Sequence, residues 1–305
     1  MKNVRLLPEN KTALVVIIMG LAFLILFWWY PLIQTFILGF RSADFSRLRE
    51  SSWVGLAQYR ALFSNKVFRK VVLNTLYFAA LVVPAQIIIG LAVSTMIDKM
   101  KNAAFQRLGL LSFYIPYVLP IVAIGILWKF LYHPSRFGIF NFLLSKVGVH
   151  EIIRWLDDPK LALTSIGIMQ IWQRVGYVIL LYFAGLQAIP RIFYEAAEID
   201  GANAWQRFRA ITLPLLTPAT LFVVVTSTIS AFMTFEAVYI MTLNVGAVTR
   251  GGPIDSTNVM LFYIYSNAFG NNRMGYASAA ATILFLMVLG VTLLQFKFIR
   301  QKFEY

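Results

Sequence analysis

Six apolar stretches divide this chain, and they constrain its fold more than any other feature of the sequence. In chain order they are Ala13–Tyr30, Val71–Ile97, Leu108–Leu131, Leu161–Ile189, Leu215–Thr242 and Ala277–Phe296. A helix of about 20 apolar residues crosses the hydrocarbon layer of a bilayer, and it satisfies its own backbone hydrogen bonds there. The pattern therefore predicts an all-α membrane protein with six transmembrane helices.

Composition supports this class and excludes several others. Apolar residues make up 59% of the 305 positions and charged residues only 13%, which is too apolar for a soluble domain of this length. The chain has no cysteine, so disulfides and thiolate metal sites are excluded. His133 and His150 fall in a polar connection, and we find no Walker A pattern or nucleophile–base set. We expect no metal site, no cofactor and no catalytic residue in this chain.

The net charge of +14 is better explained by membrane topology than by nucleic-acid binding, because the basic residues are scattered among the loops. Six spans place both termini on one side, and basic residues are denser in the segments that are cytoplasmic when the N-terminus is inside. The first apolar stretch is longer than a signal-peptide core and no small-residue cleavage site follows it. We therefore predict an uncleaved first helix and cytoplasmic termini.

A polar segment, Tyr194–Pro218, separates the fourth stretch from the fifth. Its triplet at residues 195–197 opens a short helical run, where an acidic residue suits the positive end of a helix. Asp200-Gly201 ends that run, because glycine readily adopts a left-handed conformation. An amphipathic piece with apolar residues at helical spacing follows. The residues alone indicate a cytoplasmic loop with an interfacial amphipathic helix.

The same segment resembles the EAA motif of ABC transporter permeases that import solutes. The matching positions that we expect to couple transport to ATP hydrolysis are Glu195, Ala196, Ala197, Asp200, Gly201, Ala202, Phe208, Leu213 and Pro214; Ile211 and Pro218 complete the pattern. In that family the loop forms the coupling helix, which sits in a groove of the ATP-hydrolysing subunit. The resemblance thus implies that this chain meets an ATPase on the cytoplasmic side.

The resemblance covers nearly the whole chain. Outside the EAA motif, the chain resembles the carbohydrate-importer permeases. Its further matches are Pro31, Val54-Gly55-Leu56, Tyr59, Asn74-Thr75, Tyr114-Ile115-Pro116, Leu127-Trp128-Lys129, Ala184–Pro190, Phe235–Thr242, Gly251-Gly252-Pro253, Ser256-Thr257 and Gly275–Ala280. Leu243–Arg250 departs from the pattern as an insertion. The chain resembles the maltose-permease-like or glycerol-3-phosphate-permease-like transmembrane subunit of a type I importer.

This resemblance implies a domain organisation, partners and a location. We expect a tail, first helix and outer loop over 1–70, a transmembrane domain of five helices over 71–300 with a coupling loop at 190–214, and a short tail over 301–305. The partners implied are a second homologous permease, two ABC ATPase subunits that bind ATP and Mg, and an extracytoplasmic solute-binding protein. The location implied is the cytoplasmic (inner) membrane of a bacterium or archaeon, and the mechanism is alternating access.

Ionisable residues inside spans are functional candidates, because charge is costly at membrane depth. They are Lys129, which can snorkel outward from the end of its span, and Arg174 and Glu236. Matching to the family's solute contacts implies a substrate site at Gln173, Arg174, Tyr177, Ser230, Phe232, Met233 and Glu236. Arg174 stands where the family often has a small residue, which raises an alternative: an anionic polyol phosphate or acidic oligosaccharide instead of a neutral sugar.

Two other functions compete with carbohydrate import. An ion-coupled secondary transporter explains six spans and Glu236 but leaves the EAA pattern unexplained. A non-transporting membrane anchor or sensor for an ATPase is the other alternative, and solute-dependent ATPase activity in liposomes would weaken it. Whether Arg174 pairs with Glu236, as a helix–helix contact, is open on sequence grounds, because Arg174 lies roughly 10 Å deeper along its span at 1.5 Å per residue.

Overall fold

A computed structural model describes residues 8–242 and 251–299 of the chain. The described residues are almost entirely helical, with a single pair of short antiparallel strands. The insertion at Leu243–Arg250 lies outside the described residues. Contacts between Cα atoms divide the chain into two compact units, one of residues 1–65 and 264–283 and the other of residues 66–263 and 284–305.

The first unit begins with an apolar helix over residues 12–38. No residue in the most apolar 18-residue stretch of this helix is buried. Its elements are α1 (Pro8–Leu24), the π-helical Ile25–Trp29, α2 (Tyr30–Leu38), β1 (Arg41–Ser42), the 3-10 segment Phe45–Glu50, β2 (Ser52–Trp53), α3 (Ala57–Ser64), the π-helical Ser266–Gly270 and the start of α15 (Met274–Phe298). The loop after α2 is tied to the start of α15: Gly275 N donates to Ala43 O at 2.9 Å, and Asn65 Nδ2 donates to Tyr276 OH at 3.2 Å.

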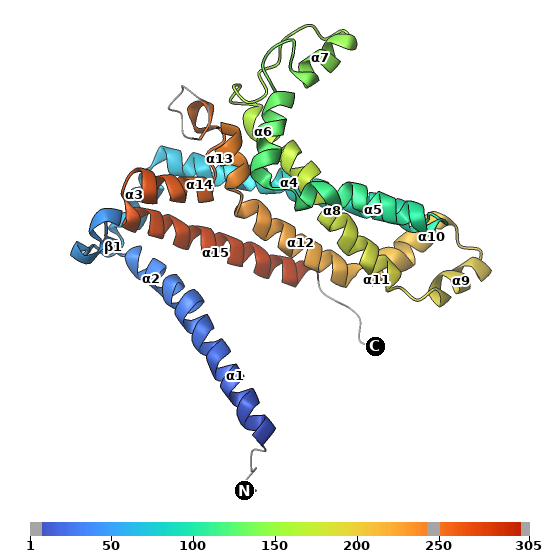
Figure 1. The fold of residues 1–305 in the computed structure, drawn as a ribbon, viewed down its shortest axis with the longest axis horizontal. Coiled ribbons are helices and arrows are strands. Elements are labelled where there is room, and N and C mark those ends of the chain that lie inside the picture. The colour runs from blue at the N-terminus through green and yellow to red at the C-terminus, as the bar shows by residue number, and fades with distance from the viewer. Residues whose placement is uncertain (1–7, 243–250, 300–305) are drawn as a thin grey trace. The chain divides into compact units, whose positions relative to one another are not determined.

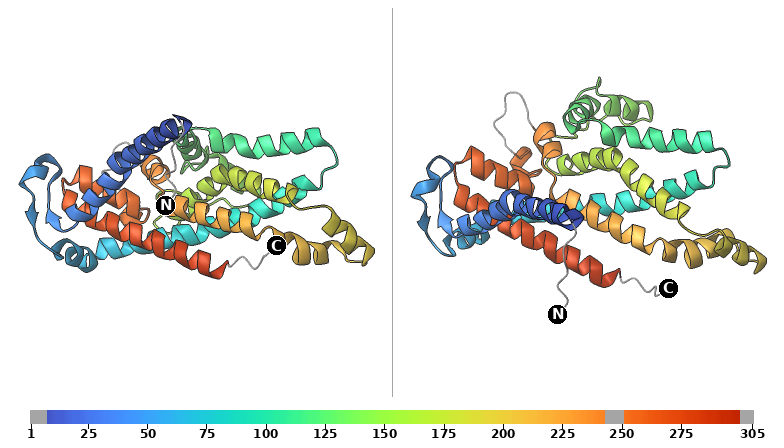
Figure 2. Two further views of the ribbon diagram at one scale, coloured as in Figure 1. Left: turned by 90° about the horizontal axis from the view of Figure 1, so that it is seen from below. Right: turned by 60° about the horizontal axis from the view of Figure 1, so that its bottom comes forward.

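The second unit holds most of the helices (Figures 1 and 2). They are α4 (Lys66–Asp98), α5 (Ala103–Val118), α6 (Ile121–Leu131), α7 (Ile139–Lys146), α8 (Ala162–Gln187), α9 (Ile192–Ile199), α10 (Ala204–Arg207), the π-helical Phe208–Thr212, α11 (Leu213–Leu215), α12 (Thr217–Phe232), α13 (Glu236–Thr242), the 3-10 segment Pro253–Asp255, α14 (Met260–Tyr265) and the rest of α15. Helix α8 is central in this unit: it packs on α4, α5 and α12.

Close backbone approach between α5 and α8 depends on one glycine. A Cβ atom added at Gly176 would lie 1.9 Å from the carbonyl oxygen of Phe113, so no larger residue fits there without moving a helix. Small residues at helix contacts let backbones approach, which is how helices associate inside a bilayer. This packing fixes the position of α8 and of the polar residues it carries next to Gly176.

The spans follow the predicted fold class, with two differences in detail. Four helices are long and apolar enough to cross a membrane, and two bent pairs bring the number to as many as six in the described parts of the chain. The expected third span, Leu108–Leu131, is broken by a 96° bend between α5 and α6. Pro120 lacks an N–H donor and disfavours a helical residue before it, and Leu119 is extended with φ −68° and ψ 144°.

The expected fifth span, Leu215–Thr242, is also interrupted. Helix α12 ends at Phe232 and a new helix, α13, begins at Glu236, so Glu236 does not lie inside a continuous span as the apolar pattern predicted. Thr234 lies in the break, and its hydroxyl hydrogen-bonds to Gln170 of α8. Helices α6 and α13 pack against each other, with Gly125 facing the side chain of Ile240.

Candidate functional site

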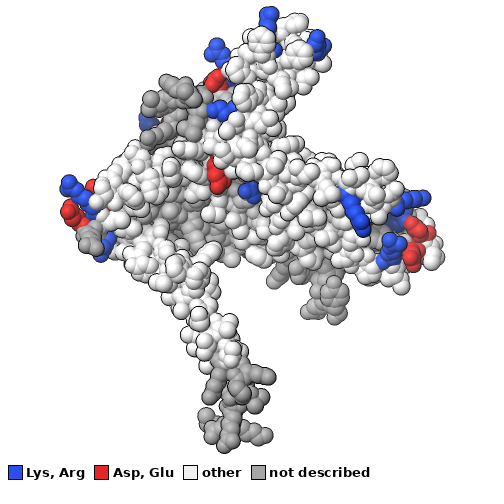
Figure 3. All heavy atoms as spheres, in the orientation of Figure 1, with Lys and Arg blue, Asp and Glu red and all other residues white. Residues whose placement is uncertain are grey.

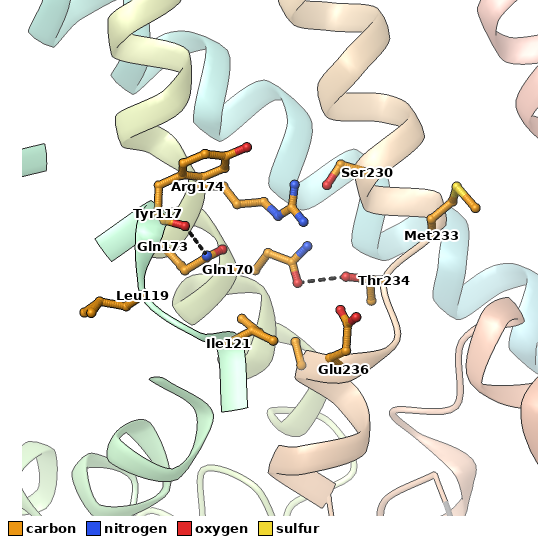
Figure 4. A pocket seen from close by; sticks show the side chains of 11 residues that line it. Tyr117, Leu119, Ile121, Gln170, Gln173, Arg174, Ser230, Met233, Thr234 and Glu236 are labelled. Atoms are coloured by element: carbon orange, nitrogen blue, oxygen red, sulfur yellow. Dashed lines mark hydrogen bonds between the residues drawn. The ribbon is translucent and has the colours of Figure 1, made fainter. Parts of the chain in front are cut away.

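A cavity of about 330 Å³ lies beside α8, at the break between α5 and α6 and at the break between α12 and α13. Its lining residues are Tyr117, Leu119, Ile121, Gln170, Gln173, Arg174, Ser230, Met233, Thr234, Glu236 and Ala237 (Figure 4). This volume is within the range of small-molecule sites. Transporters commonly bind solutes beside discontinuous helices, because unwound backbone and helix ends supply polar groups in an apolar surrounding.

Two hydrogen bonds hold the polar wall of this cavity in place. Thr234 Oγ1 donates to Gln170 Oε1 at 2.7 Å, which ties the α12–α13 break to α8. Gln173 Nε2 donates to the carbonyl oxygen of Tyr117 at 3.4 Å, which ties α8 to the end of α5. Because Gln170, Gln173 and Arg174 share one face of α8 at helical spacing, a single helix presents all three to the cavity.

Arg174 and Glu236 both face the cavity, yet they make no salt bridge within 4.0 Å in the described residues. In Figure 4 the Gln170–Thr234 hydrogen bond is drawn between the guanidinium and the carboxylate. The structure therefore answers the question left open by the sequence: the two charges are neighbours in one cavity, not an ion pair.

The predicted solute residues fall into three groups. Gln173, Arg174, Ser230, Met233 and Glu236 line the cavity together. Tyr177 does not; it lines a small space of about 20 Å³ that shares Arg174 and Ser230 with the cavity.

Phe232 is the clear exception among the residues matched to solute contacts. Its side chain is only 2% exposed and packs inside the unit, outside the cavity lining. The apolar end of α12 directs it into the core, whereas Met233 comes after the helix has ended and is 53% exposed. Lys129 also lies outside the lining, in the last turn of α6.

Sequence reasoning missed Tyr117, Gln170 and Thr234, which contribute much of the polar wall. A signal existed for two of them. Gln170 precedes Arg174 by four residues and so shares its helix face. Tyr117 lies between two prolines, which are the expected sites of a helix break in a membrane. Thr234 gave no comparable signal, because its role depends on where α12 ends.

The predicted coupling loop forms a compact helical hairpin. Helix α9 carries Glu195 in its first turn and ends at Asp200, and Gly201 follows with φ +74°. Ala202 N then donates to Ala197 O at 2.8 Å, so the left-handed residue closes the helix end. Nothing lies within 4 Å of a Cβ added at Gly201, so the backbone conformation alone requires glycine there. The structure confirms the predicted bend.

Side chains of the loop bond to one another on both sides of this bend. Asn203 and Gln206 form a reciprocal capping box at 3.0 and 2.7 Å. Arg207 pairs with Glu198 across the bend, and the hydroxyls of Tyr194 and Thr212 hydrogen-bond at 2.9 Å.

Apolar side chains remain exposed on this polar hairpin. Ile199 is 88% exposed and Trp205, which stacks on Phe208 with 5.7 Å between ring centroids, is 66% exposed. Figure 3 shows charged side chains gathered around α9 and α10 on the face it presents, whereas the flanks of the long helices are nearly uncharged. The hairpin thus presents exposed apolar side chains next to charged ones (Figure 3).

Comparison with known proteins identifies a family and several similar permeases. Residues 86–303 match the family described as "Binding-protein-dependent transport system inner membrane component". The chain is 31% identical to the "Probable ABC transporter permease protein YurN" of Bacillus subtilis, over 96% of this chain and 97% of the relative. It is 32% identical to the "Sulfoquinovosyl glycerol transport system permease protein SmoG" of Agrobacterium fabrum, over 90% and 85%.

A third relative is the "sn-glycerol-3-phosphate transport system permease protein UgpA" of Agrobacterium fabrum, 30% identical over 92% of each chain. Among solved structures, a bacterial alginate ABC transporter in complex with an alginate pentasaccharide-bound periplasmic protein superposes with a TM-score of 0.80, at 22% identity and 97% coverage of each chain. That structure shares the fold of this one. The chain therefore belongs to the inner membrane components of binding-protein-dependent transport systems, and it is an ABC importer permease.

Proposed function

We propose that this permease moves a sugar-type solute across the cytoplasmic membrane by alternating access, through the cavity beside α8. One observation carries this proposal: a polar cavity bordered by two helix breaks lies in the same compact unit as a preformed coupling hairpin. Transporters that work by alternating access commonly form a fixed solute site from discontinuous helices. Only contacts that differ between the inward and outward states can drive the shift.

The hairpin is the proposed docking surface for the ATPase. Its exposed Ile199 and Trp205 supply apolar contacts, and Asp200, Gly201 and Ala202 form the bend between the helices that carry them. ATP and Mg bind to two partner ATPase subunits, and this chain contributes no catalytic group. A second permease completes the translocation path, and an extracytoplasmic binding protein delivers the solute.

The names of similar proteins support a sugar or polyol cargo. Those relatives are a sulfoquinovosyl glycerol permease and an sn-glycerol-3-phosphate permease, and the structural neighbour carries the acidic polysaccharide alginate. The cavity here offers amide, hydroxyl and charged groups beside tyrosine rings. Such groups hydrogen-bond hydroxyls and stack on sugar faces.

Reconstitution tests this function. The tagged permease would be purified with its native partner subunits, placed in liposomes with ATP inside, and given the binding protein loaded with its copurified ligand. We expect ATP-dependent uptake and ATP hydrolysis stimulated by the loaded binding protein. Uptake driven by a sodium or proton gradient without ATP would instead identify a secondary transporter. Stimulated hydrolysis without uptake would identify a sensor.

Orientation is tested separately, because the chain has no native cysteine. We propose cytoplasmic termini and a cytoplasmic hairpin, with residues 41–70 and the α7 connection outside. Asn203→Cys should resist an impermeant maleimide in intact cells, and Phe137→Cys, at a side chain that is 95% exposed, should react. Labelling of the hairpin cysteine in intact cells would overturn this topology.

A further inference from the structure

Arg174 is a cavity charge without a fixed partner. Within residues 8–242 and 251–299 its guanidinium makes no hydrogen bond to another side chain and no ion pair within 4.0 Å. Arginine keeps its proton in proteins and offers five N–H donors in a planar fork. A charge at membrane depth is stable only with water, a counter-charge or a ligand. The small space between Arg174 and Tyr177, about 20 Å³, has room for one water.

The carboxylate of Glu236 is stabilised without the guanidinium of Arg174. It is the first residue of α13, so the partial positive charge at the start of the helix stabilises its carboxylate. Its side chain is also exposed, whereas Arg174 projects from the middle of α8, far from either end of that helix. The two charges of the cavity are therefore not equivalent, and the cation is the one left uncompensated.

The surroundings of Arg174 favour a ligand that carries both an acid group and hydroxyls. Helix α6 begins at Ile121 in the cavity wall, so its positive end adds to the field of the guanidinium. Gln173 Oε1 lacks a hydrogen-bond partner although the residue is 6% exposed, and Ser230 Oγ lacks one too. A buried amide oxygen without a donor costs about 1–3 kcal/mol, which a hydroxyl of the solute would recover.

We propose that Arg174 binds the acid group of the solute, a sugar or polyol that carries a carboxylate, sulfonate or phosphate, while Gln173 and Ser230 bind its hydroxyls. Glu236 is not a ligand of the acid group. This inference rests on the proposed function and names the class of molecule that the same cavity takes. It makes Arg174 the residue that distinguishes a charged solute from its neutral counterpart.

The test measures thermal unfolding of the complete transporter in lipid nanodiscs with two matched pairs of probes. These are D-glucuronate against D-glucose, and sn-glycerol 3-phosphate against glycerol, each at equal concentration and ionic strength. A ligand that binds the folded state raises the unfolding midpoint in proportion to the logarithm of its concentration. We expect at least one acid probe to raise the midpoint and both neutral probes to leave it in place.

Variants test whether the shift of the unfolding midpoint depends on the side chain of Arg174. Arg174→Gln should abolish the shift, and Arg174→Lys should retain part of it because the charge remains without the fork. Arg154→Gln, a matched loss of one exposed arginine outside the cavity, should keep the shift. If Arg174→Gln does not elute as an assembled complex, the comparison of Arg174→Lys with wild type decides.

Equal stabilisation by acid and neutral probes, stabilisation by none of them, or a full shift in Arg174→Gln would overturn this inference. Loss of the shift in Arg154→Gln would show that the effect follows from net charge and not from Arg174. Stimulation of ATP hydrolysis by the loaded binding protein, measured on the same sample, keeps the two proposals separate. Intact stimulation without discrimination between the probes removes only the inference, whereas absent stimulation removes the proposed function.

Discussion

The cavity beside α8 and the hairpin of α9 and α10 are both polar regions of an apolar chain, but they are built in opposite ways. In the cavity, the acceptors on Gln173 and Ser230 lack partners and Arg174 lacks an ion pair. In the hairpin, the polar groups that shape the bend bond to each other. Polar groups without hydrogen-bond partners can gain partners when a solute enters the cavity. A hairpin whose polar groups bond to each other keeps its shape when a partner pushes against it.

The largest effect should follow from breaking the hairpin at its bend. Gly201→Val places a β-branched residue at φ +74°, at a strain of roughly 1–3 kcal/mol. We expect membrane insertion to persist and hydrolysis stimulated by the loaded binding protein to fall more than tenfold. Gly201→Asn is the matched control, since asparagine tolerates this conformation, and it should stay close to wild type. Full stimulation in the valine variant would show that the bend is not needed for coupling.

A second variant pair tests whether the cavity wall is held by the bond between Gln170 and Thr234. Thr234→Val removes the donor and leaves a buried amide oxygen unsatisfied, because Gln170 is only 3% exposed. We expect a loss of about 1–3 kcal/mol in stability, measured as a lower unfolding midpoint in nanodiscs.

The double variant Gln170→Leu/Thr234→Val replaces both partners with apolar groups, so it should be more stable than the sum of the single variants predicts. Strict additivity would mean that the bond does not position the wall.

The smallest effect concerns the ion pair of Glu198 with Arg207, which lies partly in solvent and so contributes about 1 kcal/mol or less. Glu198→Arg and Arg207→Glu should each weaken stimulated hydrolysis a fewfold, because like charges then face each other across the bend. The swapped double variant should recover most of it, and the effects should shrink at high salt. Single variants indistinguishable from wild type would leave the capping box as the element that stiffens the hairpin.

The hairpin was predictable from the sequence and the cavity only in part, and the difference has a physical cause. Asp200, Gly201 and Asn203 determine the bend through contacts within a few residues, so a local pattern suffices. The cavity depends on where two spans break. Pro120 was visible, but prolines occur in unbroken membrane helices too, and Glu236 looked like a charge within a span. Only the structure shows that α12 ends at Phe232 and that Glu236 begins a new helix.

The packing of α6 on α13 limits how these two helices can move. The short helices α6 and α13 pack on each other, and each is joined to a long helix through a break, one at Leu119–Pro120 and one at residues 233–235. Two joints define a line. If the two helices move as one body about those joints, they rotate around the line that connects the joints. Ile121 of α6 and Glu236 and Ala237 of α13 all line the cavity, so a rotation of this pair would shift these three residues together.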